Sequence, residues 1–260
     1  MNARELGGFM TQDGFTVKRN LLIRSGRLSG ITPSGMQMLQ ELNVTKILDL
    51  RASGERAEYP DPEIDFAETV QISILNERAP EAKEAASLIS KRKVNTEAFI
   101  AQFNEGFTMG NVYMSFVQDA CSRERIAQVL RIFTVQPEGE AVLWHCNGGK
   151  DRTGLISLLL LSVFGVNRQE AVEDFMYSNV TFKDEIEQEL EEAKRYTTDP
   201  EILRQIATIL GVSLDNLNCL LEYVDTQFGS VEGFLTSGCG LTADELGVLK
   251  NKYLEKGKTR

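Results

Sequence analysis

One segment constrains the fold of this chain more than any other, because it places a glycine-rich turn between two apolar elements. Residues 141–144 predict a buried strand, and residues 155–164 predict an apolar helix that ends at Gly165. Between them lies His145-Cys146-Asn147-Gly148-Gly149-Lys150-Asp151-Arg152-Thr153-Gly154, called the cysteine loop below. In such a turn, successive backbone amides converge on an anion at the positive end of the helix. The segment therefore predicts an α/β fold that binds a phosphate.

Cys146 and Arg152 give the cysteine loop the pattern of a covalent phosphate-transfer site. Cys146 follows the strand, and Arg152 comes after five intervening residues, close to the start of the helix. A helix N-terminus and nearby cations favour the thiolate, which is the nucleophilic form of cysteine. The planar Arg152 side chain can bind two phosphate oxygens at once, and the Thr153 hydroxyl can donate to the sulfur. We therefore predict that Cys146 attacks a phosphate monoester that Arg152 holds.

The other residues of the cysteine loop are predicted to bind the phosphate or to shape the turn. Gly148 and Gly149 allow the backbone to turn tightly around the anion. Lys150 is followed by an aspartate where a nucleotide-binding loop requires Ser or Thr, so a metal-bound nucleoside triphosphate is not expected. We expect His145 to be an orienting, hydrogen-bonded residue and not a proton donor. The predicted phosphate-binding residues are Asn147, Gly148, Gly149, Lys150, Thr153 and, from outside the loop, Arg24.

The charge, the cysteines and the single histidine exclude several classes of function. A formal net charge of −10 disfavours a nucleic-acid partner and stable association with anionic membranes. The four cysteines lie far apart without a Cys-x-x-Cys pair, so free thiols are expected in place of disulfides or a zinc site. His145 is the single histidine, which excludes sites that need several imidazoles and most Cys-His pairs.

The sequence also gives an expectation for where the protein acts. The first residues lack the charged-then-apolar pattern of a signal peptide, and no window approaches about 18 apolar residues. We therefore expect a cytoplasmic protein without a membrane span.

The whole chain, residues 1–260, is expected to form one domain. It has an α/β core over 1–165 and a helical part over 166–260. Residues 79–134 have a largely helical pattern that is interrupted near residues 106–110. Clear helix starts are expected at Thr32-Pro33, Asp199-Pro200 and the capping box Thr242-Ala243-Asp244-Glu245. Further strands are expected at 21–24, 46–51 and 66–73.

The cysteine loop resembles the signature of the bacterial tyrosine-phosphatase-like family with a Gly-Lys-Asp-Arg-Thr loop, whose mycobacterial members act on phosphoproteins and phosphoinositides. The likeness covers most of the chain: similar segments follow in the expected order at 2–8, 23–26, 49–51, 174–179 and from 227 onward. Glu5 stands where the family has Asp. The resemblance implies the protein tyrosine phosphatase fold, a mostly parallel sheet flanked by helices, with neither a metal nor a cofactor. The helical pattern beyond residue 166 adds a helical C-terminal extension to this fold.

A phosphatase of this kind needs an acid to protonate the leaving oxygen, and the sequence offers two aspartates. The usual Trp-Pro-Asp acid loop is absent, because the only tryptophan, Trp144, precedes the nucleophile. Asp151 lies inside the cysteine loop, and Asp49 ends a predicted buried strand at the edge where ligands bind. The sequence favours Asp151 slightly. By the resemblance, Arg24 and Arg51 reach the pocket and Tyr113 and Met114 line it; surface ion pairs and core packing are equally good explanations.

The predicted reaction is hydrolysis of phosphotyrosine in proteins, with phosphoserine and phosphothreonine as further substrates, through a cysteinyl-phosphate intermediate. The main alternative is a phosphatase for phosphoinositides or other small phosphate monoesters, which Lys150 favours and the acidity disfavours. A catalytically silent phosphate-binding module is disfavoured because both Cys146 and Arg152 are present. A sulfur-transferring loop is disfavoured because Arg152-Thr153-Gly154 suits a phosphoryl group. The sequence does not predict the oligomeric state.

Overall fold

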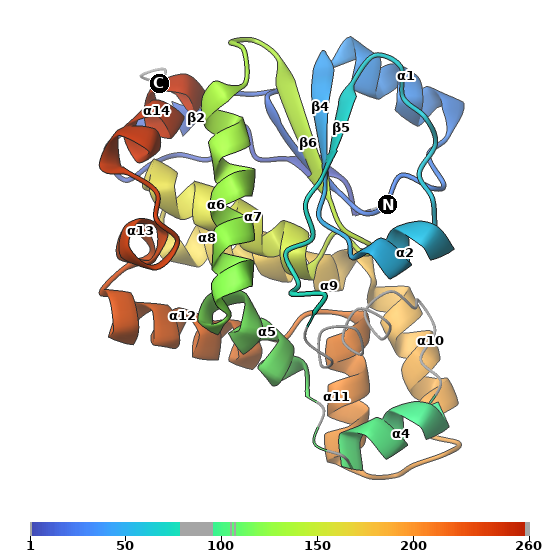
Figure 1. Ribbon diagram of the computed structural model, residues 1–260. Helices are drawn as coiled ribbons and strands as arrows, with labels where there is room; N and C mark the ends of the chain where they lie inside the picture. The colour runs from blue at the N-terminus through green and yellow to red at the C-terminus, as the bar shows by residue number, and fades with distance from the viewer. Residues whose placement is uncertain (1, 79–95, 105, 107, 258–260) are drawn as a thin grey trace.

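A five-stranded sheet forms the centre of the computed structural model, which describes residues 2–78, 96–104, 106 and 108–257 (Figure 1). Its strands lie in the order β1 (Arg4–Glu5), β3 (Leu22–Ser25), β6 (Ala141–His145), β4 (Val44–Asp49) and β5 (Glu68–Gln71). Strand β1 is antiparallel to β3, and the other neighbours are parallel. The mostly parallel sheet confirms the predicted fold class.

The cysteine loop starts at the edge where the parallel strands end together. His145, the last residue of β6, is in register with Ser25 of β3 on one side and with Asp49 of β4 on the other. Every residue of β6 is buried, as the apolar run 141–144 predicts. The register brings side chains from three distant parts of the chain to one place, because the carboxyl ends of parallel strands lie at the same edge of a sheet.

Helix α7 (Asp151–Phe164) continues directly from the cysteine loop into the core. It starts four residues earlier than the apolar pattern predicts, so that Asp151 and Arg152 belong to its first turn. Almost the whole helix is buried, which explains why its sequence is apolar on all sides. Gly165 ends the helix with φ = 80°, a left-handed conformation that glycine adopts without strain.

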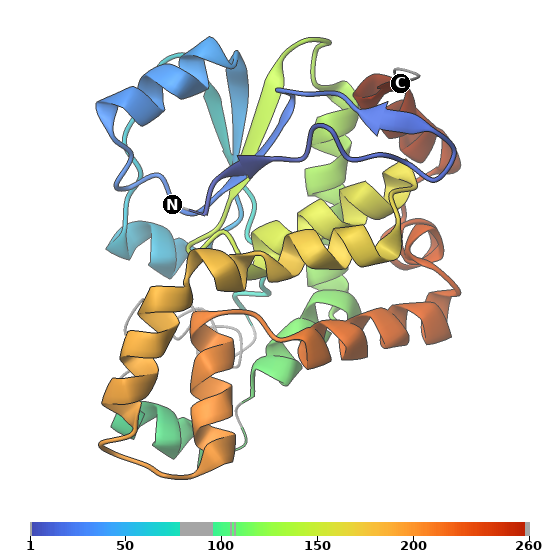
Figure 2. The same ribbon diagram turned by 180° about the vertical axis from the view of Figure 1, so that it is seen from behind.

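Other helices surround the sheet and extend beyond its carboxyl edge. Helices α4, α10 and α11 lie together on that side of the molecule, below the sheet in the front and back views (Figures 1 and 2). Besides α7, the described helices are α1 (Pro33–Glu41), α2 (Ser53–Glu58), α4 (Thr96–Asn104), α5 (Met109–Gln118), α6 (Ala120–Val135), α8 (Arg168–Met176), α9 (Ser178–Thr181), α10 (Lys183–Ala193), α11 (Pro200–Leu210), α12 (Leu214–Phe228), α13 (Val231–Gly233), a π-helical turn (Phe234–Gly238) and α14 (Ala243–Tyr253).

The predicted helix starts are confirmed by side-chain caps. Thr32 accepts a hydrogen bond from the Gly35 amide, and Asp199 accepts one from the Glu201 amide. Thr242 and Glu245 form the predicted capping box of α14. The predicted interruption near residues 106–110 is where Thr108 caps α5. The part of the helical prediction over 79–95 lies outside the described residues.

Three short strands and one helix were missed. The prediction that everything beyond Asn167 is helical is wrong at the end, where β7 (Leu254–Lys256) pairs antiparallel with β2 (Phe15–Val17). Strand β1 and helix α2 were not expected either. Each is two to six residues long. Such segments are too short to show a period, and the strands exist because a partner from a distant part of the chain lies beside them.

None of the helices in the described ranges is long and apolar enough to cross a membrane. That the chain forms a single domain over 1–260 stays a prediction.

Candidate active site

The cysteine loop is a buried turn that is fitted closely against the end of β3. Gly149 has φ = 67°, in the left-handed region, and a Cβ there would lie 2.5 Å from backbone atoms of Ser25 and Gly26. Only glycine can occupy this position without displacing the backbone. Cys146 is 1% exposed at the start of the turn, and Lys150, Asp151 and the following residues are also buried. The predicted nucleophile therefore lies in a buried, closely packed turn between β6 and α7.

Arg152 is held from one side by a carboxylate that the sequence did not identify. Its Nη1 and Nη2 donate to the two oxygens of Glu55, from α2, at 2.5 and 2.8 Å. Burial by itself would lower the pKa of Arg152, but the charge and hydrogen bonds of Glu55, together with nearby negative charges, outweigh burial and raise the pKa. The Nε of Arg152 is buried and has no hydrogen-bond partner among the described residues. One edge of the guanidinium is thus fixed, while Nε remains available for an anion.

The Thr153 hydroxyl and two guanidinium groups, of Arg24 and Arg152, are buried in the same region as Cys146. The Thr153 hydroxyl is buried and has no hydrogen-bond partner among the residues that the structure describes. The negative charge of Cys146 is among the interactions that raise the pKa of Arg152, and it opposes the lowering of the Arg24 pKa by burial. Both guanidinium groups therefore lie close enough to Cys146 to interact with a charge there. The roles of Thr153 and Arg152 toward the sulfur and the phosphate stay predictions.

Asp151 has two side-chain partners at the start of α7. Its Oδ1 accepts a hydrogen bond from the Tyr113 hydroxyl at 2.8 Å, and its Oδ2 accepts one from Lys150 Nζ at 2.7 Å. Lys150 also donates to the backbone oxygen of Gly211, which ends α11, at 2.8 Å. Burial and the Asp151 charge raise the pKa of Tyr113 well above its ordinary value, so the hydroxyl stays protonated and donates. Tyr113, expected from the resemblance to line the cleft, positions the in-loop carboxylate.

Asp49, the second predicted acid, is engaged in a different ion pair behind the loop. Arg51 Nε and Nη2 donate to its two oxygens at 2.9 and 2.8 Å, and the Arg51 amide donates at 3.0 Å. Burial alone would raise the pKa of Asp49, but the Arg51 hydrogen bonds and nearby charges outweigh it and lower the pKa. Asp49 is therefore held in its ionised form, which is the wrong form for a proton donor at neutral pH.

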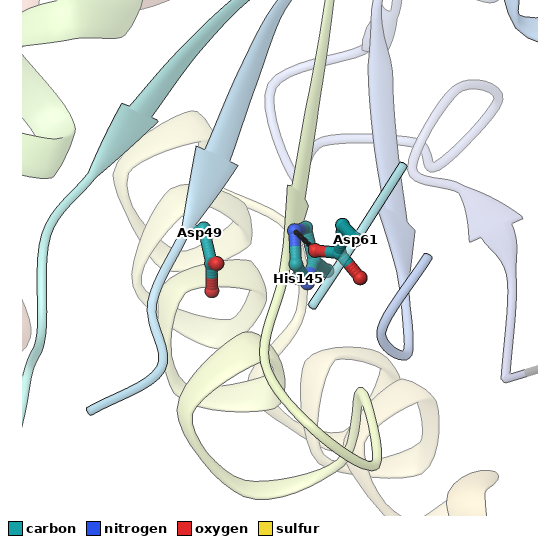
Figure 3. A group of neighbouring side chains, drawn as sticks. All are labelled: Asp49, Asp61 and His145. Carbon is teal, nitrogen blue, oxygen red and sulfur yellow. Dashed lines mark ion pairs between the residues drawn. The ribbon is translucent and has the colours of Figure 1, made fainter. Parts of the chain in front are cut away.

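His145 lies at the end of β6, between Asp49 and Asp61 (Figure 3). Its Nδ1 lies 3.2 Å from the backbone oxygen of Cys146, and its Nε2 lies 3.3 Å from Asp61 Oδ2 without hydrogen-bond geometry. Burial lowers the pKa of His145 despite the neighbouring carboxylates, and burial raises the pKa of Asp61. A neutral imidazole bound to the Cys146 carbonyl fits the expected orienting role.

Asp49, Asp61 and His145 place oxygen and nitrogen atoms within 4.8 Å of one another, as a metal site would. However, Arg51 Nη2 donates to both carboxylates, at 2.8 Å to Asp49 and 2.5 Å to Asp61. This guanidinium already supplies the positive charge that an ion would bring, and it contacts the same carboxylate oxygens. The cluster is better described as a buried ion-pair network than as a metal centre.

The remaining predicted phosphate-binding residues take several positions. Gly148 and Gly149 form the turn, and Asn147 Oδ1 accepts a hydrogen bond from Arg27 at 2.7 Å. Arg24 is fully buried on the far side of the turn, where its Nη2 donates to the backbone oxygen of Gly149 at 2.9 Å. A direct contact between Arg24 and phosphate stays a prediction, since the contacts described here are with the loop backbone and with Asp174.

Neither Glu55 nor Asp61 was predicted from the sequence to belong to the site. A signal for Glu55 was present, because a carboxylate three residues after a helix cap commonly accepts the cap amide. Its Oε2 does accept the Ala52 amide at 2.9 Å. Asp61 follows a proline in an irregular segment, and nothing local connects it to His145.

Comparisons with known proteins agree with the geometry of this site. The family model described as the tyrosine phosphatase family matches residues 1–255. A Cupriavidus necator protein, provisionally named a tyrosine-protein phosphatase, is 29% identical over 90% of this chain and 80% of its own length. The triple specificity protein phosphatase PtpB of Mycobacterium tuberculosis is 28% identical over 82% of this chain and 84% of its own. A tyrosine-protein phosphatase of Nostoc commune is 25% identical over 93% and 76%.

Proposed function

The chain belongs to the tyrosine phosphatase family and is a phosphatase, and we propose that it hydrolyses phosphotyrosine in proteins through a cysteinyl-phosphate intermediate. The proposed mechanism rests on the hydrogen bonds that Arg152 makes and on the one that it lacks. Glu55 fixes two of its nitrogens, and the buried Nε has no partner among the described residues. A buried donor without a partner is costly, so this geometry suits an arginine that completes its hydrogen bonds with a phosphate oxygen.

The proposed first step is attack of the Cys146 thiolate on phosphorus. A sulfur–phosphorus bond forms, the bond from phosphorus to the ester oxygen breaks, and the leaving oxygen takes a proton from a general acid. Backbone amides of the cysteine loop and Arg152 bind the equatorial oxygens, where negative charge is concentrated in the transition state. Water then attacks phosphorus and gives its proton to the same carboxylate, and the thiolate leaves.

Asp151 is the proposed acid and base, in preference to Asp49. Tyr113 and Lys150 orient its carboxyl group within the loop. Asp49 is tied to Arg51 by hydrogen bonds that lower its pKa, so it would rarely carry a proton to donate.

Phosphoserine, phosphothreonine and phosphoinositides form the second group of proposed substrates. PtpB, a relative of similar length, is named for triple specificity. One observation disfavours the phosphoinositide. Lys150, the second cation of the cysteine loop, is buried and donates to Asp151 and to the backbone oxygen of Gly211. A phosphate elsewhere on an inositol ring would have to compete with these contacts. We place phosphotyrosine first for this reason, and the cytoplasm as the site of action stays part of the proposal.

The test is a parallel assay of a phosphotyrosine peptide, matched phosphoserine and phosphothreonine peptides, a phosphoinositide and thiosulfate. We expect the highest kcat/KM on phosphotyrosine and no sulfur transfer. Incubation with substrate followed by acid quench should leave a phosphate on Cys146, detected by mass spectrometry. A preference for the phosphoinositide would reverse the order of substrates, and absence of the adduct together with activity in Cys146→Ser would disprove the covalent mechanism.

A further inference from the structure

A buried network of polar side chains lies behind the cysteine loop, on the side away from Asp49. Arg24 Nη1 donates to Asp174 Oδ2 at 2.5 Å, and Arg4 Nε donates to Asp174 Oδ1 at 2.7 Å. Arg4 also donates to Asn2 Oδ1 at 2.6 Å. Asn2 is 2% exposed, Asp174 is 8% exposed and Arg24 is fully buried. The network thus connects the first residues of the chain, strand β3 and helix α8, and is called the rear network below.

The rear network ends on one atom of the loop, the backbone oxygen of Gly149. Arg24 Nη2 and Asn2 Nδ2 both donate to it, each at 2.9 Å. Asn2 Nδ2 also lies 3.0 Å from the Ser178 hydroxyl, which links the contact to α9. Two side-chain donors on one loop carbonyl define its direction more firmly than one, because both must be displaced before the carbonyl can rotate.

Fixing this carbonyl also fixes an amide. The oxygen of Gly149 and the N–H of Lys150 belong to one peptide plane, and the described chain contains no cis peptide bond. In a trans peptide the C=O and N–H point in opposite directions. A Gly149 oxygen that points toward Arg24 and Asn2 therefore aims the Lys150 amide away from them, into the turn. Earlier in the turn, the Arg27 amide donates to the oxygen of Asn147 at 3.0 Å and orients the Gly148 amide in the same way.

The rear network also carries excess positive charge. Two arginines, Arg4 and Arg24, share the single carboxylate of Asp174. Burial lowers the pKa of Arg24 to about 10, partly offset by Asp174, so it remains a cation at neutral pH. A buried arginine with half a counter-charge would be costly unless another negative charge lay nearby. A negative charge on Cys146 would act on Arg24 in this way, and a bound phosphate would do the same.

We propose that Arg24 and Asn2 are positioning residues, which aim the Lys150 amide at the phosphate by holding the Gly149 carbonyl. The proposal rests on the proposed function of the cysteine loop and extends it to residues that do not touch the substrate. It assigns Arg24 a role through the backbone in place of a direct phosphate contact. Asp174 and Arg4 hold the two donors in place.

The experiment measures anion binding and catalysis in Arg24→Gln, Arg24→Lys and Asn2→Ala. We expect Asn2→Ala to weaken competitive inhibition by inorganic phosphate and vanadate about fivefold, since one hydrogen bond is lost. Arg24→Gln, which also removes the charge, should lower kcat/KM for p-nitrophenyl phosphate about 100-fold. Arg24→Lys should recover part of the loss, because it keeps the charge and one donor.

The matched control is Arg131→Gln. Arg131 also binds one carboxylate, Glu245 at 2.8 Å, and one backbone oxygen, Gly240 at 2.7 Å, and neither partner belongs to the cysteine loop or to the rear network. We expect it to lower the melting temperature without changing the phosphate inhibition constant. If Asn2→Ala and Arg24→Gln behave in the same way as this control, losing stability but keeping the inhibition constants within about twofold, the proposal is wrong.

Anion binding also separates this proposal from the proposed function. Protection of Cys146 from iodoacetamide by inorganic phosphate needs no turnover and can be measured in every variant. If the wild-type protein hydrolyses no phosphate ester, the proposed function fails. Weaker protection in Asn2→Ala would still support the positioning role, whereas equal protection in Asn2→Ala and wild type would contradict it. Asn2→Ala leaves the Arg24–Asp174 pair intact, so this arm does not depend on Arg24→Gln being folded.

Discussion

The cysteine loop is held by ion pairs on two flanks whose charge balance is opposite. On the β4 flank, the carboxylates of Asp49, Glu55 and Asp61 outnumber the guanidinium groups of Arg51 and Arg152. On the flank of the rear network, Arg4 and Arg24 outnumber Asp174. The β4 flank orients side chains, Arg152 and His145, whereas the rear network orients a backbone peptide. One flank thus fixes the Arg152 side chain, and the other places positive charge beside the loop backbone that it orients.

The largest effect is expected from Arg152→Lys, which changes the arginine that the β4 flank holds for the proposed phosphate contact. Arg152→Lys keeps the charge but loses the planar group that Glu55 fixes at two nitrogens. We expect kcat/KM for a phosphotyrosine peptide to fall by about 1,000-fold. Steady-state kinetics and phosphate inhibition check this prediction. Activity within about tenfold of wild type would show that the bidentate geometry is unimportant, since tenfold corresponds to about 1.4 kcal/mol.

The next prediction compares Asp151, in the cysteine loop, with Asp49, on the β4 flank. Asp151→Asn should slow phenyl phosphate about 100-fold and an activated nitrophenyl ester much less, because an acid matters most for a basic leaving oxygen. Asp49→Asn should slow both esters alike, because Asp49 pairs with Arg51. The ratio of the two rates in each variant is the measurement. A selective loss in Asp49→Asn with a uniform loss in Asp151→Asn would reverse the assignment.

A smaller effect is expected when the partner of Arg152 is changed without changing its size. Glu55→Gln retains a side-chain oxygen for one guanidinium nitrogen but removes the buried counter-charge. We expect kcat to fall about tenfold, and phosphate to raise the melting temperature more than in wild type, because the anion then neutralises Arg152. The exposed Glu58→Gln, on the same helix, is the control. A phosphate-induced shift no larger than that of wild type would contradict this account of Glu55.

The smallest expected effect concerns stability at acid pH. The folded protein lowers the pKa of Asp49, so its ionised form stabilises the fold above the unfolded pKa of about 3.9. This contribution is lost as the pH falls through the lower, folded value. In urea unfolding between about pH 3 and 7, wild type should therefore lose stability more steeply below about pH 4 than Asp49→Asn does. The exposed Asp65→Asn should follow the wild-type slope, and an identical slope in Asp49→Asn would disprove the assignment.

Much of the fold could be predicted because its main elements carry local signals. The apolar run 141–144, the glycine turn and the apolar run 155–164 specify a strand, a loop and a helix without help from the rest of the chain. Side-chain caps at Thr32, Asp199 and Thr242 likewise depend on neighbouring residues only. The short strands β2 and β7 could not be predicted, because each is stabilised by the other from the opposite end of the sequence.

For the site, the sequence by itself predicted the chemistry, and only the tertiary structure decided which residues surround the cysteine loop. Cys146, Arg152 and Thr153 are identified by their spacing within one turn, since a turn brings them together whatever surrounds it. Partner residues come from elsewhere: Glu55 lies 97 positions from Arg152, and Asn2 lies 147 positions from Gly149. Packing also decides the partners of each carboxyl group: Asp49 is bound by Arg51, whereas Asp151 is bound by Tyr113 and Lys150. Spacing encodes contacts within a turn; contacts between turns depend on how the strands and helices pack.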